Sequence, residues 1–171
     1  MKRATPILLC FVLGCVSDDL PKSYELGGLR VLAVIADQPE VDPGETVTLT
    51  PLLSDLDGDG RTIRFSADAC LDPGVSVGAE PTCDGSPTRV VLATNQSATG
   101  LVDPERTGLL TSTVSVTVPD ASVIFASRSA IDRFNGVGYL VAFRFTAGSD
   151  EVRASKKIVV STRTTKNQNP A

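Results

Sequence analysis

The sequence predicts an all-β fold in which two sheets pack face to face, and three observations support this prediction. Apolar and polar residues alternate along several short segments, which is the pattern of strands with one buried face. Turn-forming groups such as Asp42-Pro43-Gly44 separate these segments. Val, Thr and Ser are frequent and aromatic residues make up only 5% of the chain, a composition that favours strands over helices. The length of 171 residues fits one domain.

Seven segments are expected to form the strands. In order along the chain they are 29–36, 45–50, 63–69, 89–94, 111–118, 139–145 and 152–162. Their number and the turns between them predict an immunoglobulin-like two-sheet sandwich of about seven strands. The apolar positions expected to face the core are Val47, Leu49, Ile63, Phe65, Ala67, Ala69, Val114, Val116, Val118, Tyr139, Val141, Phe143, Phe145, Ile158 and Val160.

Two of these segments depart from simple alternation. The segment 29–36 is almost continuously apolar, so it is expected to be buried on both faces. In the segment 152–162, Lys156 and Lys157 interrupt the apolar pattern. This predicts an irregularity in the strand and an edge protected against aggregation.

The segment 120–136 has a different pattern from the rest of the domain. Asp120 is suited to cap the start of a helix, and Asn135-Gly136 is suited to end it. Ile124 and Ile131 would then share one helical stripe. The pattern predicts a short helix over 120–135, with an irregular loop as an equal alternative.

The first fourteen residues have the pattern of a secretory leader. Lys2 and Arg3 precede an apolar run over 7–13, and a small residue, Gly14, stands before Cys15. The run is shorter than the roughly 20 apolar residues that a membrane-spanning helix needs. The sequence therefore predicts a signal peptide over 1–14. The alternative is an N-terminal strand of the fold.

The segment Val12-Leu13-Gly14-Cys15 resembles the lipobox of bacterial lipoproteins. The resemblance implies cleavage before Cys15, acyl chains on that cysteine and a membrane anchor, with the polar segment 15–28 as a tether. In Gram-negative lipoproteins a residue such as Val16 after the cysteine favours the outer membrane, with the domain in the periplasm or on the cell surface. An ordinary signal peptide cut nearby, with Cys15 incidental, is the alternative.

This interpretation accounts for all four cysteines of the chain. Of the four cysteines, Cys10 leaves with the leader and Cys15 carries the lipid. Cys70 and Cys83 are then expected to form a disulfide, since pairing is the default in an oxidising compartment. A redox or metal-binding pair is the alternative, but the spacing is not Cys-x-x-Cys and the chain contains no His.

Two turn motifs carry a second resemblance. Asp-Pro-Gly-Glu-Thr-Val over 42–47, and Asp-Leu-Asp-Gly-Asp-Gly over 55–60 before a strand centred on Phe65, resemble the PKD or bacterial immunoglobulin-like domains of surface lipoproteins. The resemblance extends over 29–162. Its motifs specify a fold more than a function.

The sharpest candidate site is the group Asp55, Asp57 and Asp59. These carboxylates stand at alternate positions and are followed by Gly60. Ca²⁺-binding loops place their oxygen ligands around the ion with the same pattern. Position twelve of an EF-hand would be Glu, whereas Ser66 stands there. The motif therefore predicts at most a partial Ca²⁺ site, and a solvated turn is the alternative.

The remaining polar residues do not indicate an enzyme. With no His in the chain, the serines lack the commonest base. The net charge is −4 and Lys2 and Arg3 belong to the leader, so the domain is acidic and a poor nucleic-acid binder. The expected domain spans 29–163, followed by a polar tail over 164–171. No cofactor is required.

The sequence predicts a non-catalytic surface module for adhesion, envelope structure or use as an accessory subunit. A protein or polysaccharide partner would contact loops at one end of the sandwich, namely 70–83, 55–60 and 120–136. A Ca²⁺-dependent carbohydrate or protein binder is the second hypothesis, and a hydrolase is the third. Either the tail is a free end, or the functional part belongs to a separate chain.

Overall fold

A computed structural model describes residues 27–74, 79–98, 110–111 and 113–167. The predicted signal peptide 1–14, the lipid site Cys15 and most of the tether 15–28 lie outside these residues.

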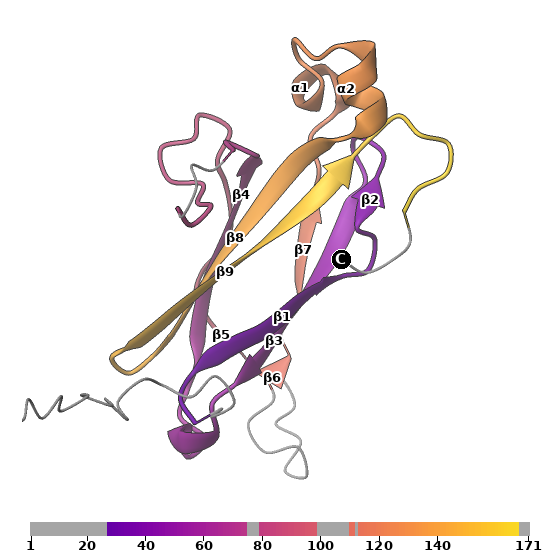
Figure 1. Cartoon of the computed structure of the whole chain (residues 1–171). Helices are drawn as coiled ribbons and strands as arrows, with labels where there is room; N and C mark the ends of the chain where they lie inside the picture. Colours follow the sequence, from indigo (N-terminus) through magenta and orange to yellow (C-terminus); the bar gives the residue numbers. More distant parts are fainter. Residues whose placement is uncertain (1–26, 75–78, 99–109, 112, 168–171) are drawn as a thin grey trace, which may run out of the picture.

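Within these ranges, nine strands form two sheets (Figure 1). The strands are β1 (Arg30–Ala36), β2 (Glu40–Val41), β3 (Thr46–Ser54), β4 (Arg64–Leu71), β5 (Val90–Ser97), β6 (Leu110–Thr111), β7 (Val114–Thr117), β8 (Val137–Ala147) and β9 (Asp150–Val160). The helical segments are a 3-10 turn η1 (Leu56–Gly58), α1 (Ala121–Ile124) and α2 (Ala130–Asn135).

The two sheets have the strand order of an immunoglobulin sandwich. One sheet runs β1-β3-β6, with β7 also pairing with β3. The other runs β2-β9-β8-β4-β5, antiparallel except where β2 pairs with β9 in parallel. The immunoglobulin fold has this arrangement, with β1, β3 and β7 in one sheet and β4, β8 and β9 in the other. The predicted fold class is therefore confirmed.

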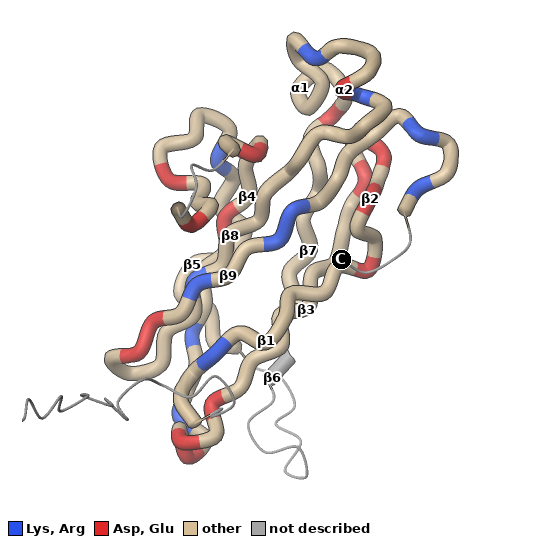
Figure 2. The backbone as a smooth tube through the Cα atoms, viewed as in Figure 1, with Lys and Arg blue, Asp and Glu red and all other residues tan. Residues whose placement is uncertain are grey.

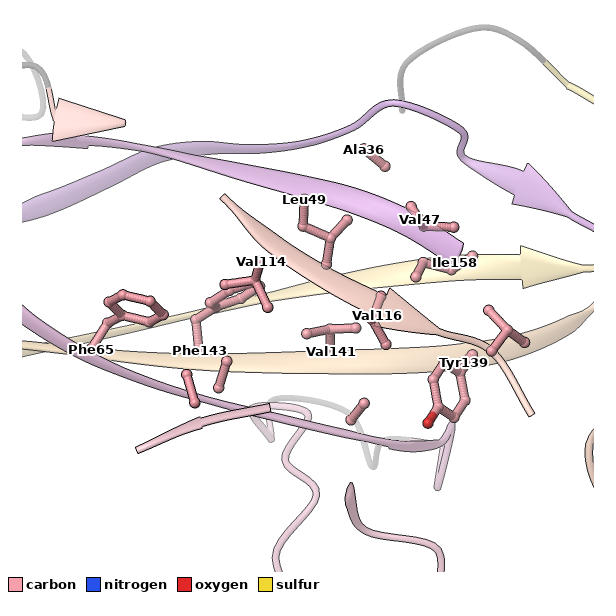
Figure 3. Close-up of a cluster of buried hydrophobic side chains, with 14 of the residues drawn as sticks. Ala36, Val47, Leu49, Phe65, Val114, Val116, Tyr139, Val141, Phe143 and Ile158 are labelled. Atoms are coloured by element: carbon pink, nitrogen blue, oxygen red, sulfur yellow. The ribbon is translucent and has the colours of Figure 1, made fainter. Parts of the chain in front are cut away.

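The core lies between the two sheets, where side chains of β3 and β7 face those of β8 and β9 (Figure 3). Every position that the alternation predicts to face inward is buried. Three phenylalanines fill one end of this core: the ring centroids of Phe65 and Phe145 lie 6.1 Å apart, and those of Phe143 and Phe145 lie 5.9 Å apart. Burying each such side chain contributes about 1.5–3 kcal/mol.

The prediction that 29–36 is buried on both faces is wrong. Leu32 is 44% exposed and Ile35 is 41% exposed. The strand β1 lies at the edge of its sheet, and the outer face of that sheet is open to solvent at these positions. Continuous apolar sequence therefore indicated a strand but not two buried faces.

The prediction of an irregularity at Lys156 and Lys157 is also wrong. The pairing of β8 with β9 runs without a register shift from Val137 opposite Val160 to Ala147 opposite Asp150. Lys156 lies opposite the inward-facing Val141 and is only 9% exposed. The strand β9 pairs with β2 only at its last two residues, so the rest of this edge of the sheet has no paired strand among the described residues. Lys156 points inward from this edge. An inward-pointing charge at an edge strand discourages pairing with the sheet edge of another molecule.

The segment 120–136 forms two short helices instead of one. Ser127, with a φ of 56°, lies in the left-handed region between α1 and α2. A capping box starts α2: the Ser129 side chain accepts from the Asp132 N–H, and the Asp132 side chain accepts from the Ser129 N–H. The predicted shared stripe is wrong because the break turns Ile131 to solvent (71% exposed), while Ile124 is 1% exposed.

The predicted polar tail begins as part of the domain. The Lys166 ammonium donates to the Asp42 carboxylate and to the Ser161 carbonyl, both at 2.8 Å. The N–H of Asn167 donates to Glu40 at 2.8 Å. Residues 164–167 therefore return to β2, and 168–171 lie outside the described residues.

Candidate functional site: a groove beside the disulfide

The structure does not gather the three predicted Ca²⁺ ligands around one point. Both carboxylate oxygens of Asp55 accept hydrogen bonds from Arg61 at 2.7 Å, and Arg61 also donates to Asp150 at 2.7 Å. The hydrogen bond to Asp55, followed by the one to Asp150, raises the pKa of Arg61. In the part of the chain that the structure describes, no three His, Cys, Asp or Glu side chains are placed to hold a metal ion. Arg61 therefore joins Asp55 to the β8–β9 turn.

The three loops predicted to form one binding end lie at two ends of the sandwich. The Asp loop 55–60 sits beside the β8–β9 turn, as the Arg61–Asp150 pair shows. The helices α1 and α2 lie at the opposite end (Figure 1), and the loop after β4 starts near them, since Leu71 pairs with Tyr139. The reason is that β4 runs the length of the sheet between the two loops. The predicted grouping of 55–60 with 70–83 and 120–136 is therefore wrong.

The predicted disulfide between Cys70 and Cys83 is confirmed. The two sulfur atoms lie 2.13 Å apart and the two Cα atoms 5.7 Å apart. Cys70 lies on the outer face of the five-stranded sheet, opposite Leu140 on β8, and Cys83 packs on both. These three residues form a small apolar cluster separate from the core. The bond therefore holds the loop after β4 against the outside of the sheet.

The described segment 80–84 of this loop and the outer face of the sheet line an open groove of about 180 Å³. Ala142 and Ser155, which lie opposite each other on β8 and β9, are among the residues that form its floor. The segment 80–84 forms the wall on the loop side. Two arginines, Arg144 and Arg153, line it on the sheet side. The small side chain of Ala142 leaves the space that a larger residue would fill.

The two sides of the groove differ in charge. Glu80 and Asp84 lie on the loop wall, whereas the lining from β8 and β9 carries Arg144 and Arg153. Figure 2 shows mainly acidic residues on the loop beside β4, and basic residues along β8 and β9 with acidic residues at the turn between these strands. The hydrogen bond of Arg153 to Glu151 raises the pKa of Arg153, and the charges of Glu80 and Asp84 add to this effect. The groove therefore suits a polar ligand that carries one group to pair with the arginines and another to pair with the carboxylates.

A further ion pair fixes the end of the groove next to β4. Arg89 donates to the Asp68 carboxylate at 2.9 Å and lies 3.5 Å from Asp84. The hydrogen bond to Asp68 raises the pKa of Arg89. Arg89 therefore partly neutralises Asp84, whereas the charge of Glu80 acts on Arg153 without an ion pair between these two described residues.

Sequence reasoning identified the disulfide but not the groove that it builds. The groove residues on the sheet are outward positions of strands, which an alternation pattern marks only as solvent-facing. The available signal was the small Ala142 and Ser155 at outward positions of adjacent strands, close to a disulfide loop. That signal depends on strand register, which the sequence alone did not supply.

Comparisons with known proteins do not indicate a function for this chain. No family model matches this sequence, and no curated protein matches it. Among solved structures, the chain is similar to part of a cycloisomaltooligosaccharide glucanotransferase from Paenibacillus sp., solved with cycloisomaltoheptaose (18% identity, TM-score 0.42, 80% of this chain and 14% of that chain). It is also similar to Spo0M, a sporulation control protein from Bacillus subtilis (17% identity, TM-score 0.37, 80% of this chain and 51% of that chain).

In both cases the chain spans less than two thirds of the solved protein. At these TM-scores neither likeness supports an argument about the function of this chain. No helix in the described part of the structure has the length and apolar character needed to cross a membrane.

Proposed function

We propose that this protein is a non-catalytic, lipid-anchored module of a bacterial envelope that binds a partner or ligand in the groove beside its disulfide. The groove is the observation that supports binding most directly. It combines a floor of small residues, charged groups of both signs and a wall fixed by a covalent bond. A site built on a rigid sheet with one fixed loop is organised before its ligand arrives, which reduces the entropy lost on binding.

The anchor in this proposal is the lipid on Cys15, in the outer membrane. The leader pattern and the lipobox resemblance support it, and the Cys70–Cys83 disulfide fits an oxidising compartment. Because the Gly27 carbonyl accepts a hydrogen bond from the Asp57 N–H, Gly27 belongs to the domain, and the residues from 15 to 26 can span at most roughly 40 Å at about 3.5 Å per residue. The domain would then stand clear of the lipid headgroups, in the periplasm or on the cell surface.

Labelling with radioactive palmitate tests the anchor. The wild type and a Cys10→Ser variant are expected to take up label, because Cys10 is removed with the leader. A Cys15→Ser variant is expected to take up none and to leave the membrane fraction. Equal labelling of the Cys15→Ser variant would refute the lipid assignment.

Site-specific photo-crosslinking in intact cells tests the groove. A photoreactive residue replaces Ser155 on the groove floor, and in a control it replaces Ser115, an exposed residue of β7 in the other sheet. Crosslinked products specific to position 155 are expected. Products at both positions in equal yield, or at position 115 alone, would show that the groove is not the binding site.

The proposal favours binding over catalysis because of the side chains that line the groove. The hydroxyl of Ser66 accepts a hydrogen bond from the Asn95 N–H at 3.0 Å, so it is held by the backbone. The chain contains no His that could activate a hydroxyl group. Incubation with peptidoglycan and polysaccharide substrates is expected to yield no turnover.

A further inference from the structure

Arg144 and Arg153 lie directly opposite each other on neighbouring antiparallel strands. Both are exposed on the outer face of the five-stranded sheet and both line the groove. Two like charges at opposite positions destabilise a sheet. Glu151 already neutralises Arg153, and an anion bound beside both guanidinium groups would also neutralise Arg144.

The two arginines differ in their partners. Arg153 is paired with Glu151, at 2.9 Å from Nε and 2.8 Å from a terminal nitrogen. Arg144 forms no ion pair or side-chain hydrogen bond with the residues that the structure describes. Its guanidinium group, with five N–H donors, is free to hold a carboxylate by two parallel hydrogen bonds.

The opposite wall limits what else the ligand carries. Glu80 and Asp84 on the loop accept hydrogen bonds and repel negative charge. A ligand that is anionic throughout, such as phosphate, would face these two carboxylates. A ligand with a carboxylate at one end and hydroxyl or ammonium donors at the other end complements both sides.

The size of the groove limits the ligand further. Its volume of about 180 Å³ is below the roughly 300–1,000 Å³ typical of sites for drug-sized molecules. One acidic sugar residue or one amino acid is of a suitable size, whether free or at the end of a longer chain. We propose that the groove binds a small carboxylate-bearing ligand, with the carboxylate between Arg144 and Arg153 and hydrogen-bond donors facing Glu80 and Asp84.

This inference rests on the proposed function only in taking the groove as the binding site. Its test is a calorimetric and NMR titration of the full chain in detergent micelles with glucuronate, alanine and glucose. Glucuronate, alanine or both are expected to bind, and glucose, which has the same ring but no carboxylate, at least tenfold more weakly. Binding of glucuronate alone assigns an acidic sugar, and binding of alanine alone assigns an amino acid.

Two matched variants identify the residues responsible. Arg144→Gln is expected to weaken binding of the acid about tenfold or more, because a hydrogen bond to a charged group is lost. Arg64→Gln, at another exposed arginine on an outward position of β4 but outside the groove lining, is expected to leave binding unchanged. Unchanged melting temperatures would show that both variants fold.

The titration and the two variants can also give results that contradict the proposal. Glucose binding as tightly as glucuronate, equal loss in both variants, or no binding of either acid at millimolar concentration would overturn the carboxylate assignment. Crosslinking at Ser155 without acid binding would refute this assignment alone. Acid binding without palmitate on Cys15 would support this assignment and refute the lipid anchor of the proposed function.

Discussion

The carboxylate of Glu40 accepts a hydrogen bond from the hydroxyl of Ser161, a residue 121 positions later in the chain. Glu40 is 2% exposed and Ser161 is fully buried. The same carboxylate accepts from the Asn167 N–H and lies 3.7 Å from Arg163. Since β2 has only two residues, this pair adds to the backbone hydrogen bonds that hold β2 beside the end of β9.

The Glu40 pair makes stability depend on pH. Burial alone raises the pKa of Glu40, but the hydrogen bonds from Ser161 and Asn167 and the charges of Arg163 and Lys166 outweigh it, so the pKa is lowered from 4.5. A carboxyl group with a lowered pKa stabilises the fold above its unfolded-state pKa, and this contribution is lost as pH falls through the folded-state value.

Substitution Glu40→Gln checks this dependence. At pH 7 the variant is expected to lose about 2 kcal/mol of unfolding free energy, the cost of removing a hydrogen-bonded buried charge. Below pH 4 the difference from the wild type is expected to shrink, as measured by urea unfolding at several pH values. A difference that stays constant from pH 7 to pH 3 would contradict the ionised state of Glu40.

The Arg61–Asp55 pair is expected to stabilise the loop end of the sandwich. The Asp55 side chain is 6% exposed, and Arg61→Gln leaves its carboxylate without its guanidinium partner. The melting temperature is expected to fall by roughly 5 °C, as expected for a loss of one to two kcal/mol in a domain of this size. Arg64→Gln is the control, and an equal fall in that variant would show that Asp55 is not the cause.

Calcium is expected to leave the melting temperature of the wild type unchanged. A ligand that binds only the native state raises this temperature, but both oxygens of Asp55 already accept hydrogen bonds from Arg61. Differential scanning calorimetry with EDTA and with millimolar Ca²⁺ measures the effect. A rise with Ca²⁺ that disappears in Asp57→Asn would restore the calcium hypothesis.

Loss of the disulfide is expected to affect both stability and the groove. Replacing Cys70 and Cys83 by Ser opens a loop with a sequence separation of 13, which costs about 3 kcal/mol in the chain-entropy model. The NMR signals of Thr82 and Ala142, which line the groove, are expected to shift as its wall is released. A reducing agent is expected to lower the unfolding free energy of the wild type but not of the double variant.

The inward face of each long strand could be predicted from the sequence because a period of two follows directly from strand geometry. The residues Tyr139 to Phe145 are an example, since the four apolar side chains at alternate positions all enter the core. The disulfide could be predicted because the expected leader and lipid site accounted for Cys10 and Cys15, which left Cys70 and Cys83 to pair.

Other features depend on neighbours that the sequence does not specify. The strand β2 is two residues long and is defined by its pairing with β9. An alternation of apolar and polar residues cannot be recognised over two positions, so the sequence could not predict this strand. The break at Ser127 required a left-handed backbone at a residue that carries no such signal. The groove required the register that places Arg144 opposite Arg153.

The parallel pairing of β2 with β9 has a mechanical consequence. The Val159 N–H donates to the Pro39 carbonyl and the Ser161 N–H donates to the Val41 carbonyl. Tension between the segment before β1 and the segment after β9 pulls these parallel strands in opposite directions along their own axes. The bonds between them are then loaded in shear and must break together, so this pairing resists extension of the chain between those two segments.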